Sequence, residues 1–230
     1  MPRHDPTVAA AAGPAATGSA LGWTTVGWMY AARTVWFLTH PQVVVDPAAD
    51  VRTWHLSPVG RARAEALAGA PVVAAATSLW SSTETKAVET AEAMCGIRPV
   101  LRNERLGEND RSATGFVPPA EFEELADAFF AHPGESVRGW ATARDEQNRI
   151  VAAVEEILGA PDSGDGDIVL VAHGAVGTLL LCHLLGVPIT RDHDQPSQGQ
   201  VFAFDRDTRA VRFTWRPLES LLTPAPQPRR

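Results

Sequence analysis

Short apolar segments alternate with helix-like segments along residues 33–218, and this alternation limits the possible folds more than any other feature of the sequence. Three apolar runs have the length and composition of buried strands: Thr34–Leu38, Val72–Thr77 and Ile168–Ala172. When strands and helices alternate in this way, the strands form a mostly parallel sheet with helices packed on both faces. The sequence therefore predicts an α/β fold of three layers, α/β/α.

Residues that favour helix boundaries support this interpretation. Ser57 and Pro58 form an N-cap followed by proline at the first helical position, and glycines close two later helices at Gly159 and Gly186. The expected helices are Arg61–Leu67, Thr83–Met94, Glu121–Phe130, Val137–Leu158 and Gly177–Leu185. Two alternating segments near the C-terminus, Val201–Phe204 and Val211–Trp215, predict a hairpin at the edge of the sheet.

Both ends of the chain differ in composition from the rest. Residues 1–32 are rich in Ala, Gly and Pro, have no periodic apolar face, and are predicted to be a disordered extension. This extension lacks the basic region and compact apolar run of a secretory signal, and translation could start at Met1 or Met29. Residues 219–230 are predicted to be a polar, Pro-rich tail. Residues 33–218 remain as one folded domain.

Bulk composition excludes some partners. The net charge of −7 argues against a nucleic-acid or membrane-surface binder, because those partners require a basic face. Histidines interrupt the longest apolar runs, and none approaches the roughly 20 residues needed to span a bilayer. The only two cysteines, Cys95 and Cys182, lie in apolar helix-like stretches, which predicts buried thiols and a cytoplasmic protein. The sequence leaves the oligomeric state open.

Potentially reactive side chains follow the predicted strands. His40 follows the first strand, Ser82 follows Leu79-Trp80-Ser81 with Lys86 nearby, and His173 follows the strand that ends at Ala172. Ligands of open α/β sheets bind beyond the carboxyl ends of the strands. We therefore expect the two histidines to face each other across one pocket.

An ordered set of motifs resembles the histidine phosphatase (phosphoglycerate mutase-like) superfamily. Phe37-Leu-Thr-His-Pro41 is similar to the Leu-x-Arg-His-Gly motif of that family, and Trp80–Glu92 is similar to its Ser-Ser-Pro-x-x-Arg-Ala-x-x-Thr-Ala motif. The remaining matches, in chain order, are the helix after Leu56, Leu106-Gly-Glu108, Gly134-Glu-Ser136 and Val169–Gly174. The resemblance spans residues 33–205 approximately, which is nearly the whole predicted domain.

This resemblance implies phosphoryl transfer through a covalent intermediate on His40. It further implies that Glu108 acts as the general acid and base and that His173 binds phosphate oxygens, without a metal or other cofactor. Lys86 occupies the position of a family arginine, and Ser82 lies in the same motif, so both are predicted to contact phosphate.

Two residues beside His40 depart from the family pattern. Thr39 replaces an arginine that would bind phosphate, and Pro41 replaces a glycine. Thr39 itself, Arg111 and Arg52 are candidates to contact phosphate in place of the missing arginine. The segment 107–133 is predicted to form a short cap over the site, which favours a small substrate or one that binds in an open site.

The leading hypothesis is a phosphatase that hydrolyses a small phosphorylated substrate. A non-catalytic relative that binds a phosphorylated ligand or a protein is the alternative from a different class, and the Thr39 and Pro41 replacements support it. A phosphomutase is a further alternative, although the longer and more basic insert typical of that group is not evident. A metal site formed by Cys182, His183 and His193 is disfavoured, because adjacent helical residues point to different faces.

Overall fold

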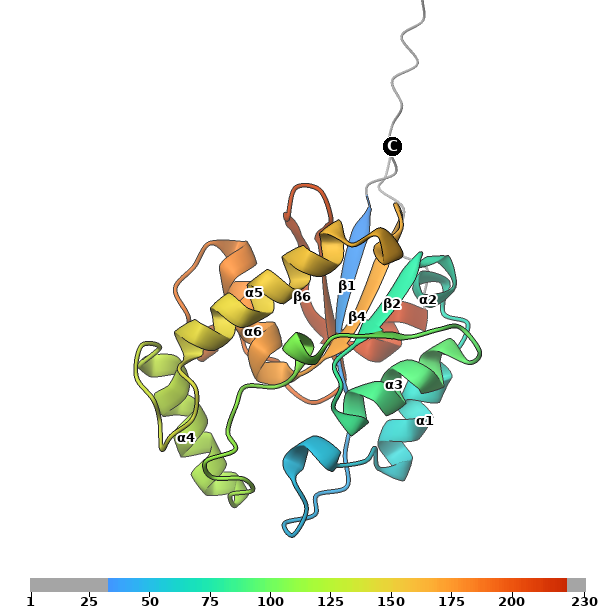
Figure 1. Cartoon of the computed structure of the whole chain (residues 1–230). Coiled ribbons are helices and arrows are strands. Elements are labelled where there is room, and N and C mark those ends of the chain that lie inside the picture. Colours follow the sequence, from blue (N-terminus) through green and yellow to red (C-terminus); the bar gives the residue numbers. More distant parts are fainter. Residues whose placement is uncertain (1–32, 223–230) are drawn as a thin grey trace, which may run out of the picture. The chain divides into compact units, whose positions relative to one another are not determined.

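The computed structural model describes residues 33–222, which form a six-stranded sheet (Figure 1). The strand order is β3-β2-β4-β1-β5-β6. The pairs β1–β4, β2–β4 and β2–β3 are parallel, whereas β5 and β6 form the antiparallel hairpin that the sequence predicts at one edge. The strands are β1 (Thr34–Thr39), β2 (Ser78–Ser81), β3 (Leu101–Arg102), β4 (Ile168–Ala172), β5 (Gln200–Asp205) and β6 (Val211–Pro217).

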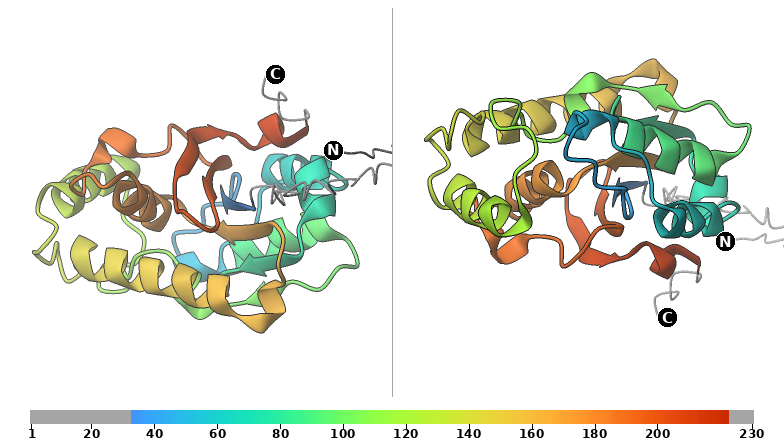
Figure 2. Two further views of the ribbon diagram at one scale, coloured as in Figure 1. Left: turned by 90° about the horizontal axis from the view of Figure 1, so that it is seen from above. Right: turned by 90° about the horizontal axis from the view of Figure 1, so that it is seen from below.

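Helices cover both faces of this sheet, which confirms the predicted α/β class and its three layers. Seen from above, the yellow-green, yellow and orange helices lie on one side of the strands, and the teal and blue-green helices lie on the other (Figure 2). The helices are α1 (Pro58–Ala66), α2 (Pro71–Ala75), α3 (Thr85–Cys95), α4 (Pro119–Ala131), α5 (Ala143–Gly159) and α6 (Gly174–Leu185).

The central strand β4 shows how the sequence produces two cores. All five of its residues are buried. Ile168 and Leu170 pack into a cluster with α4, α5 and α6, whereas Val169 and Val171 pack into a second cluster with α2 and α3. Successive strand residues point to opposite faces, so a strand buried on both faces must be apolar throughout.

One predicted strand is wrong. Val72–Thr77 is not a strand: Pro71–Ala75 forms helix α2, and the strand begins six residues later, at Ser78. Pro71 occupies the first turn of the helix, where its missing N–H costs nothing. Val73 buries its side chain in the second core cluster from this short helix, so the apolar residues are used in a different secondary structure.

Two helix boundaries also differ from the prediction. The helix predicted from Val137 begins at Ala143, because the Thr142 side chain caps it and accepts a hydrogen bond from the Asp145 N–H at 3.1 Å. Gly139, with φ of +84°, lies in the preceding turn. Helix α6 begins at Gly174, directly after His173, and ends at the predicted Gly186, which has a left-handed conformation.

The packed chain extends beyond the predicted boundary at residue 218. Leu218–Leu222 forms a short 3-10 helix, and both Leu218 and Leu221 are buried in the second core cluster. The predicted extension over 1–32 and residues 223–230 of the predicted tail lie outside the described residues. Both Cys95 and Cys182 are free and buried, as expected.

The predicted cap segment consists of a loop followed by α4. Phe129 and Phe130 of this helix are buried in the first core cluster. Phe116, on the preceding loop, is half-buried outside that cluster, with its ring centroid 6.1 Å from that of Trp54. The cap is therefore anchored to the domain through one face of α4.

Gly177 allows α6 to approach the sheet closely. A Cβ atom at this position would lie 2.7 Å from a ring carbon of Phe37 and 2.8 Å from one of Trp215. Alanine favours helices over glycine by about 1 kcal/mol, but overpacking costs about 1–3 kcal/mol, so we expect Gly177→Ala to lower the free energy of unfolding by up to roughly 2 kcal/mol.

Chemical denaturation of the purified protein measures this difference. Gly159→Ala is the matched control, because Gly159 lies at the end of α5 and an added Cβ would meet no atom within 4 Å. Equal stabilities of the two variants would show that the contact of α6 with Phe37 and Trp215 is looser than described.

Candidate active site

The carboxyl ends of β1, β2 and β4 bring three predicted site residues together. The His40 N–H donates to the Ala172 carbonyl at 3.2 Å, and the Ser82 N–H donates to the Val171 carbonyl at 3.0 Å. The rings of His40 and His173 lie edge to face, with centroids 5.3 Å apart. The two histidines therefore share one site at this edge of the sheet.

The hydrogen bond of His40 determines its tautomer. Its Nδ1 lies 2.9 Å from the carbonyl oxygen of Pro41, and a carbonyl can only accept, so Nδ1 carries the proton. Burial, followed by electrostatic interaction with His173 and Lys86, lowers the pKa of His40 from 6.5 to about 3. The ring is therefore neutral near pH 7, with its lone pair on Nε2. Proline at position 41 removes an N–H but keeps the carbonyl that orients this ring.

His173 is fully buried beside His40. Its Nε2 lies 2.7 Å from the Ser82 hydroxyl and 3.6 Å from Glu84 Oε1. Its Nδ1 has no hydrogen-bond partner among the described residues. Burial, together with the charge of Lys86, lowers the pKa of His173 well below its ordinary value. Ser82, which the sequence assigns to phosphate, is fully buried and bound to His173 instead.

Glu84 connects several of these groups, although the sequence analysis does not single it out. Its Oε2 accepts a hydrogen bond from Lys86 Nζ at 2.5 Å, and its Oε1 accepts one from the Glu108 N–H at 2.7 Å. Lys86 Nζ also donates to the Val51 carbonyl at 2.8 Å. The charge of Lys86 is thus balanced inside the protein. The available signal was the position of Glu84 within the Trp80–Glu92 motif.

Glu108 lies at the N-terminus of α6. Its carboxylate oxygens accept hydrogen bonds from the backbone N–H groups of Val176 at 3.2 Å and Ala175 at 3.4 Å. Burial raises the pKa of Glu108 above its ordinary value of 4.5, and the nearby charge of Arg111 opposes this effect. A carboxyl group with a raised pKa holds its proton more readily near neutral pH, as a general acid requires.

An ion pair on α5 holds the loop that carries Glu108. Arg149 donates to the carbonyls of Gly107 and Glu108, both at 3.0 Å. Its partner Glu146 accepts from the Asp110 N–H at 3.0 Å. In the sequence, only the three-residue spacing of opposite charges on one predicted helix indicates this ion pair, and we did not predict it.

A cavity of about 430 Å³ lies in front of His40. Its lining includes His40, Lys86, Glu108, Arg111 and Gln195. The Arg111 guanidinium lies 4.9 Å from the centre of the Phe122 ring, and its buried Nε has no partner among residues 33–222. Arg111 is thus a cation in the same cavity as His40 and Glu108.

Two predicted phosphate contacts lie elsewhere. Arg52 lines a neighbouring cavity of about 750 Å³, which Glu108 and Arg111 also line but His40 does not, and it binds the Asp50 carboxylate at 2.5 Å. Thr39 is fully buried, and its hydroxyl is hydrogen-bonded to Gln195 at 2.7 Å and to the Gln200 N–H at 3.0 Å. Neither residue lines the 430 Å³ cavity in front of His40, and each side chain is bound to a neighbour within the protein.

Comparison with known families agrees with this geometry. A model of the histidine phosphatase superfamily (branch 1) matches residues 41–213, which is more than half of the 230-residue chain. The chain belongs to this superfamily. The match begins directly after His40, next to the two replacements at Thr39 and Pro41. No sequence among the curated proteins matches the chain significantly.

Solved structures of other proteins have the same fold. Bacillus stearothermophilus YhfR has a TM-score of 0.66 at 21% identity, covering 83% of this chain and 99% of its own. A mycobacterial glucosyl-3-phosphoglycerate phosphatase in complex with inorganic phosphate has a TM-score of 0.62 at 22% identity, covering 80% and 95%. A putative α-ribazole-5'-phosphate phosphatase from Escherichia coli has a TM-score of 0.59 at 18% identity, covering 81% and 96%.

Two further searches cover the described part of this superfamily member, one for a metal site and one for a membrane span. Within residues 33–222, no group of three or more His, Cys, Asp or Glu side chains is placed to hold a metal ion. In the same range, no helix has the length and apolar composition required to cross a bilayer.

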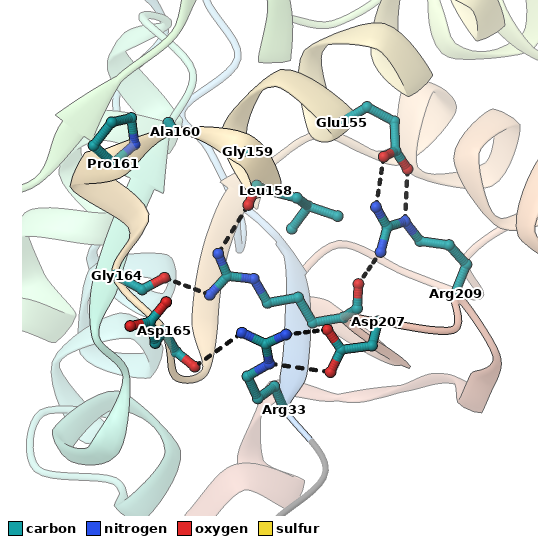
Figure 3. Close-up of a pocket in the computed structure, with 11 residues that line it drawn as sticks. Arg33, Glu155, Leu158, Gly159, Ala160, Pro161, Gly164, Asp165, Asp207 and Arg209 are labelled. Carbon is teal, nitrogen blue, oxygen red and sulfur yellow. Dashed lines mark hydrogen bonds and ion pairs between the residues drawn. The ribbon is translucent and has the colours of Figure 1, made fainter. Parts of the chain in front are cut away.

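A cavity of about 600 Å³ at the opposite edge of the sheet is filled with internal ion pairs (Figure 3). Arg209 binds Glu155 at 2.5 Å, and Arg33 binds Asp207. Arg206 donates to the carbonyls of Leu158 at 2.8 Å and Gly164 at 2.7 Å, at the end of α5. These arginines already have partners within the protein, and their ion pairs and hydrogen bonds connect the segments that meet at this edge of the domain.

The depressed pKa of His40 predicts a loss of stability in acid. The unfolded chain binds a proton at about pH 6.5, whereas the folded protein resists it down to about pH 3. The unfolded state therefore binds more protons over this interval, and the free energy of unfolding should fall as the pH decreases through it.

Denaturant titrations across this pH range test this expectation. In His40→Gln the fall should be smaller, because the group that must stay neutral is gone. His132→Gln removes an exposed histidine and should keep the wild-type pH dependence. The same pH dependence in all three proteins would contradict the burial of a neutral His40.

Proposed function

We propose that this protein is a phosphatase that hydrolyses a small phosphorylated substrate through a phosphohistidine on His40. The observation that carries the proposal is the Nδ1–H of His40 bound to the Pro41 carbonyl, in a cavity that Glu108 also lines. A neutral ring held in this way presents a nucleophilic nitrogen, and a nearby carboxyl with a raised pKa can supply a proton.

The reaction proceeds in two steps. The lone pair of His40 Nε2 attacks phosphorus, the bond from phosphorus to the leaving oxygen breaks, and Glu108 gives its proton to that oxygen. Glu108 then takes a proton from a water molecule, and the oxygen of that water attacks the phosphorus bound to His40 Nε2. The nitrogen–phosphorus bond breaks, inorganic phosphate leaves, and both side chains return to their starting states.

Arg111 supports catalysis in this proposal by compensating for the arginine that Thr39 replaces. It lines the cavity with His40 and Glu108, and its Nε has no partner among the described residues. Negative charge spreads over the oxygens of the transferring phosphoryl group, so an available guanidinium in a half-enclosed cavity favours the transition state.

The substrate we propose is a small phosphomonoester, and a cytoplasmic location remains a prediction. The named relatives act on a glucosyl-3-phosphoglycerate and, putatively, on α-ribazole-5'-phosphate, both of which are small molecules. The phosphomutase alternative is disfavoured because the cap helix α4 is acidic, with Glu121, Glu123, Glu124 and Asp127. A non-catalytic binding protein would need neither a proton donor nor a fixed tautomer at its site.

The proposed intermediate predicts a labelled protein. Brief incubation with a phosphoester labelled in its phosphate should leave acid-labile, base-stable label on the wild type and none on His40→Ala. Glu108→Gln should accumulate label if it slows hydrolysis of the intermediate more than its formation. Rapid quenching and counting measure the label. Label that survives acid, or that persists in His40→Ala, would contradict the assignment.

Two arginine variants test the proposed phosphate cation. Arg111→Met should lower kcat/KM by about tenfold to a hundredfold, since a charge-assisted hydrogen bond contributes about 1.5–3 kcal/mol. Arg52→Met is the matched control, because Arg52 does not line the cavity that contains His40 and is bound to Asp50. Steady-state phosphate release measures both variants. A larger loss in Arg52→Met than in Arg111→Met would reverse the assignment.

A further inference from the structure

The side chain of Gln195 lies in the same cavity as His40, although no sequence motif identifies it. Gln195 is half-buried on the loop between Arg191–His193 and β5. Its Oε1 lies 2.7 Å from the hydroxyl of Thr39, the residue that replaces the family arginine. The residue beside the nucleophile is thus connected to a polar side chain in the cavity.

The hydrogen bonds of Thr39 determine which way the Gln195 amide points. The Thr39 hydroxyl accepts from the Gln200 N–H at 3.0 Å and has a single proton to donate. Its two possible acceptors are Gln195 Oε1 at 2.7 Å and the Gln200 carbonyl at 3.5 Å, and the shorter contact is the better hydrogen bond. The amide oxygen of Gln195 therefore faces Thr39, and its NH₂ group faces away from Thr39.

This NH₂ group lies at the N-terminus of α6. A Cβ atom on Gly174, the first residue of that helix, would lie 2.2 Å from Gln195 Nε2, so only glycine leaves room for the amide. Gly174 directly follows His173 and also lines the cavity. Within residues 33–222, Nε2 has no hydrogen-bond acceptor. Two unused donors are thus held at the N-terminus of α6, on a side chain that lines the same cavity as His40.

We propose that Gln195 is a phosphate-binding residue whose two amide hydrogens bind oxygens of the phosphoryl group, and that Thr39 is its positioning residue. This inference rests on the proposed function, because it assumes that phosphate occupies the cavity in front of His40. In this arrangement Thr39 does not touch phosphate itself; it orients the Gln195 amide that does. A neutral double donor held by a buried hydroxyl thereby occupies part of the role of the missing arginine.

Calorimetric binding of inorganic phosphate and of vanadate to the full chain tests the inference without requiring turnover. Gln195→Met removes both donors at similar volume and should weaken both anions by about tenfold. Gln195→Glu keeps an acceptor for Thr39 but adds a negative charge, so it should weaken them further. Gln147→Met is the control, because Gln147 is a half-buried glutamine of α5 that binds the Leu179 carbonyl away from the cavity.

A double-mutant cycle tests the role of Thr39. Thr39→Val removes the hydroxyl at nearly constant shape and should weaken phosphate severalfold in the wild type but not in Gln195→Met. Thr39→Ser keeps the hydroxyl and should restore most of the affinity. If Thr39→Val does not fold, Thr39→Ala, which also lacks the hydroxyl, takes its place in the cycle with the same expected and contradicting results.

Wild-type affinity in Gln195→Met, with the protein folded, would overturn the assignment of Gln195. Additive losses in the cycle would overturn the positioning role of Thr39. These failures are distinct from failure of the proposed function. A wild type that hydrolyses phosphoesters while Gln195→Met binds phosphate normally rejects only the inference. A wild type that binds phosphate through Gln195 but hydrolyses no phosphoester rejects only the proposed activity.

Discussion

Parallel pairing of β1 with β4 is the interaction on which the rest of the domain depends. The register places Thr39 opposite Ala172, so the residues that follow, His40 and His173, leave the sheet at the same edge. The same pairing lies between two helical layers, and alternate residues of β4 contribute to both core clusters. A shift of one residue would exchange the two faces of the strand and separate the two rings. The register of β1 against β4 therefore determines both the packing of the core and the geometry of the site.

Buried polar groups at this edge are tolerated because they bind one another. Glu84 binds Lys86 and the backbone of Glu108, and Ser82 binds His173. An isolated charge in such surroundings would cost several kcal/mol, whereas paired charges with further hydrogen bonds recover much of that cost. Burial also keeps His40 neutral and raises the pKa of Glu108. The same desolvation therefore stabilises the protonation states that a nucleophile and an acid require.

The two departures from the family pattern have different physical consequences. Pro41 costs little, because the carbonyl that orients His40 does not depend on the residue's side chain or N–H. Thr39 removes a guanidinium, and its hydroxyl is committed to Gln195 and Gln200 inside the protein. Charge at the site must then come from a different element. Arg111, on the loop that Arg149 holds beside Glu108, is in a position to supply it.

The sequence by itself determined the α/β class, five of the helices, and the presence of His40, Glu108 and His173 at strand or loop ends, because apolar periodicity and short motifs are local properties. It failed at Val72–Thr77, where an apolar run too short to show periodicity forms a helix after Pro71. The sequence could not show that Arg111, and not Arg52, lines the cavity with His40. Nor could it show that the hydroxyls of Thr39 and Ser82 are hydrogen-bonded to other residues of the protein. Only the tertiary structure decided these points, since they depend on contacts between residues far apart in the chain, such as Thr39 with Gln195 and Ser82 with His173.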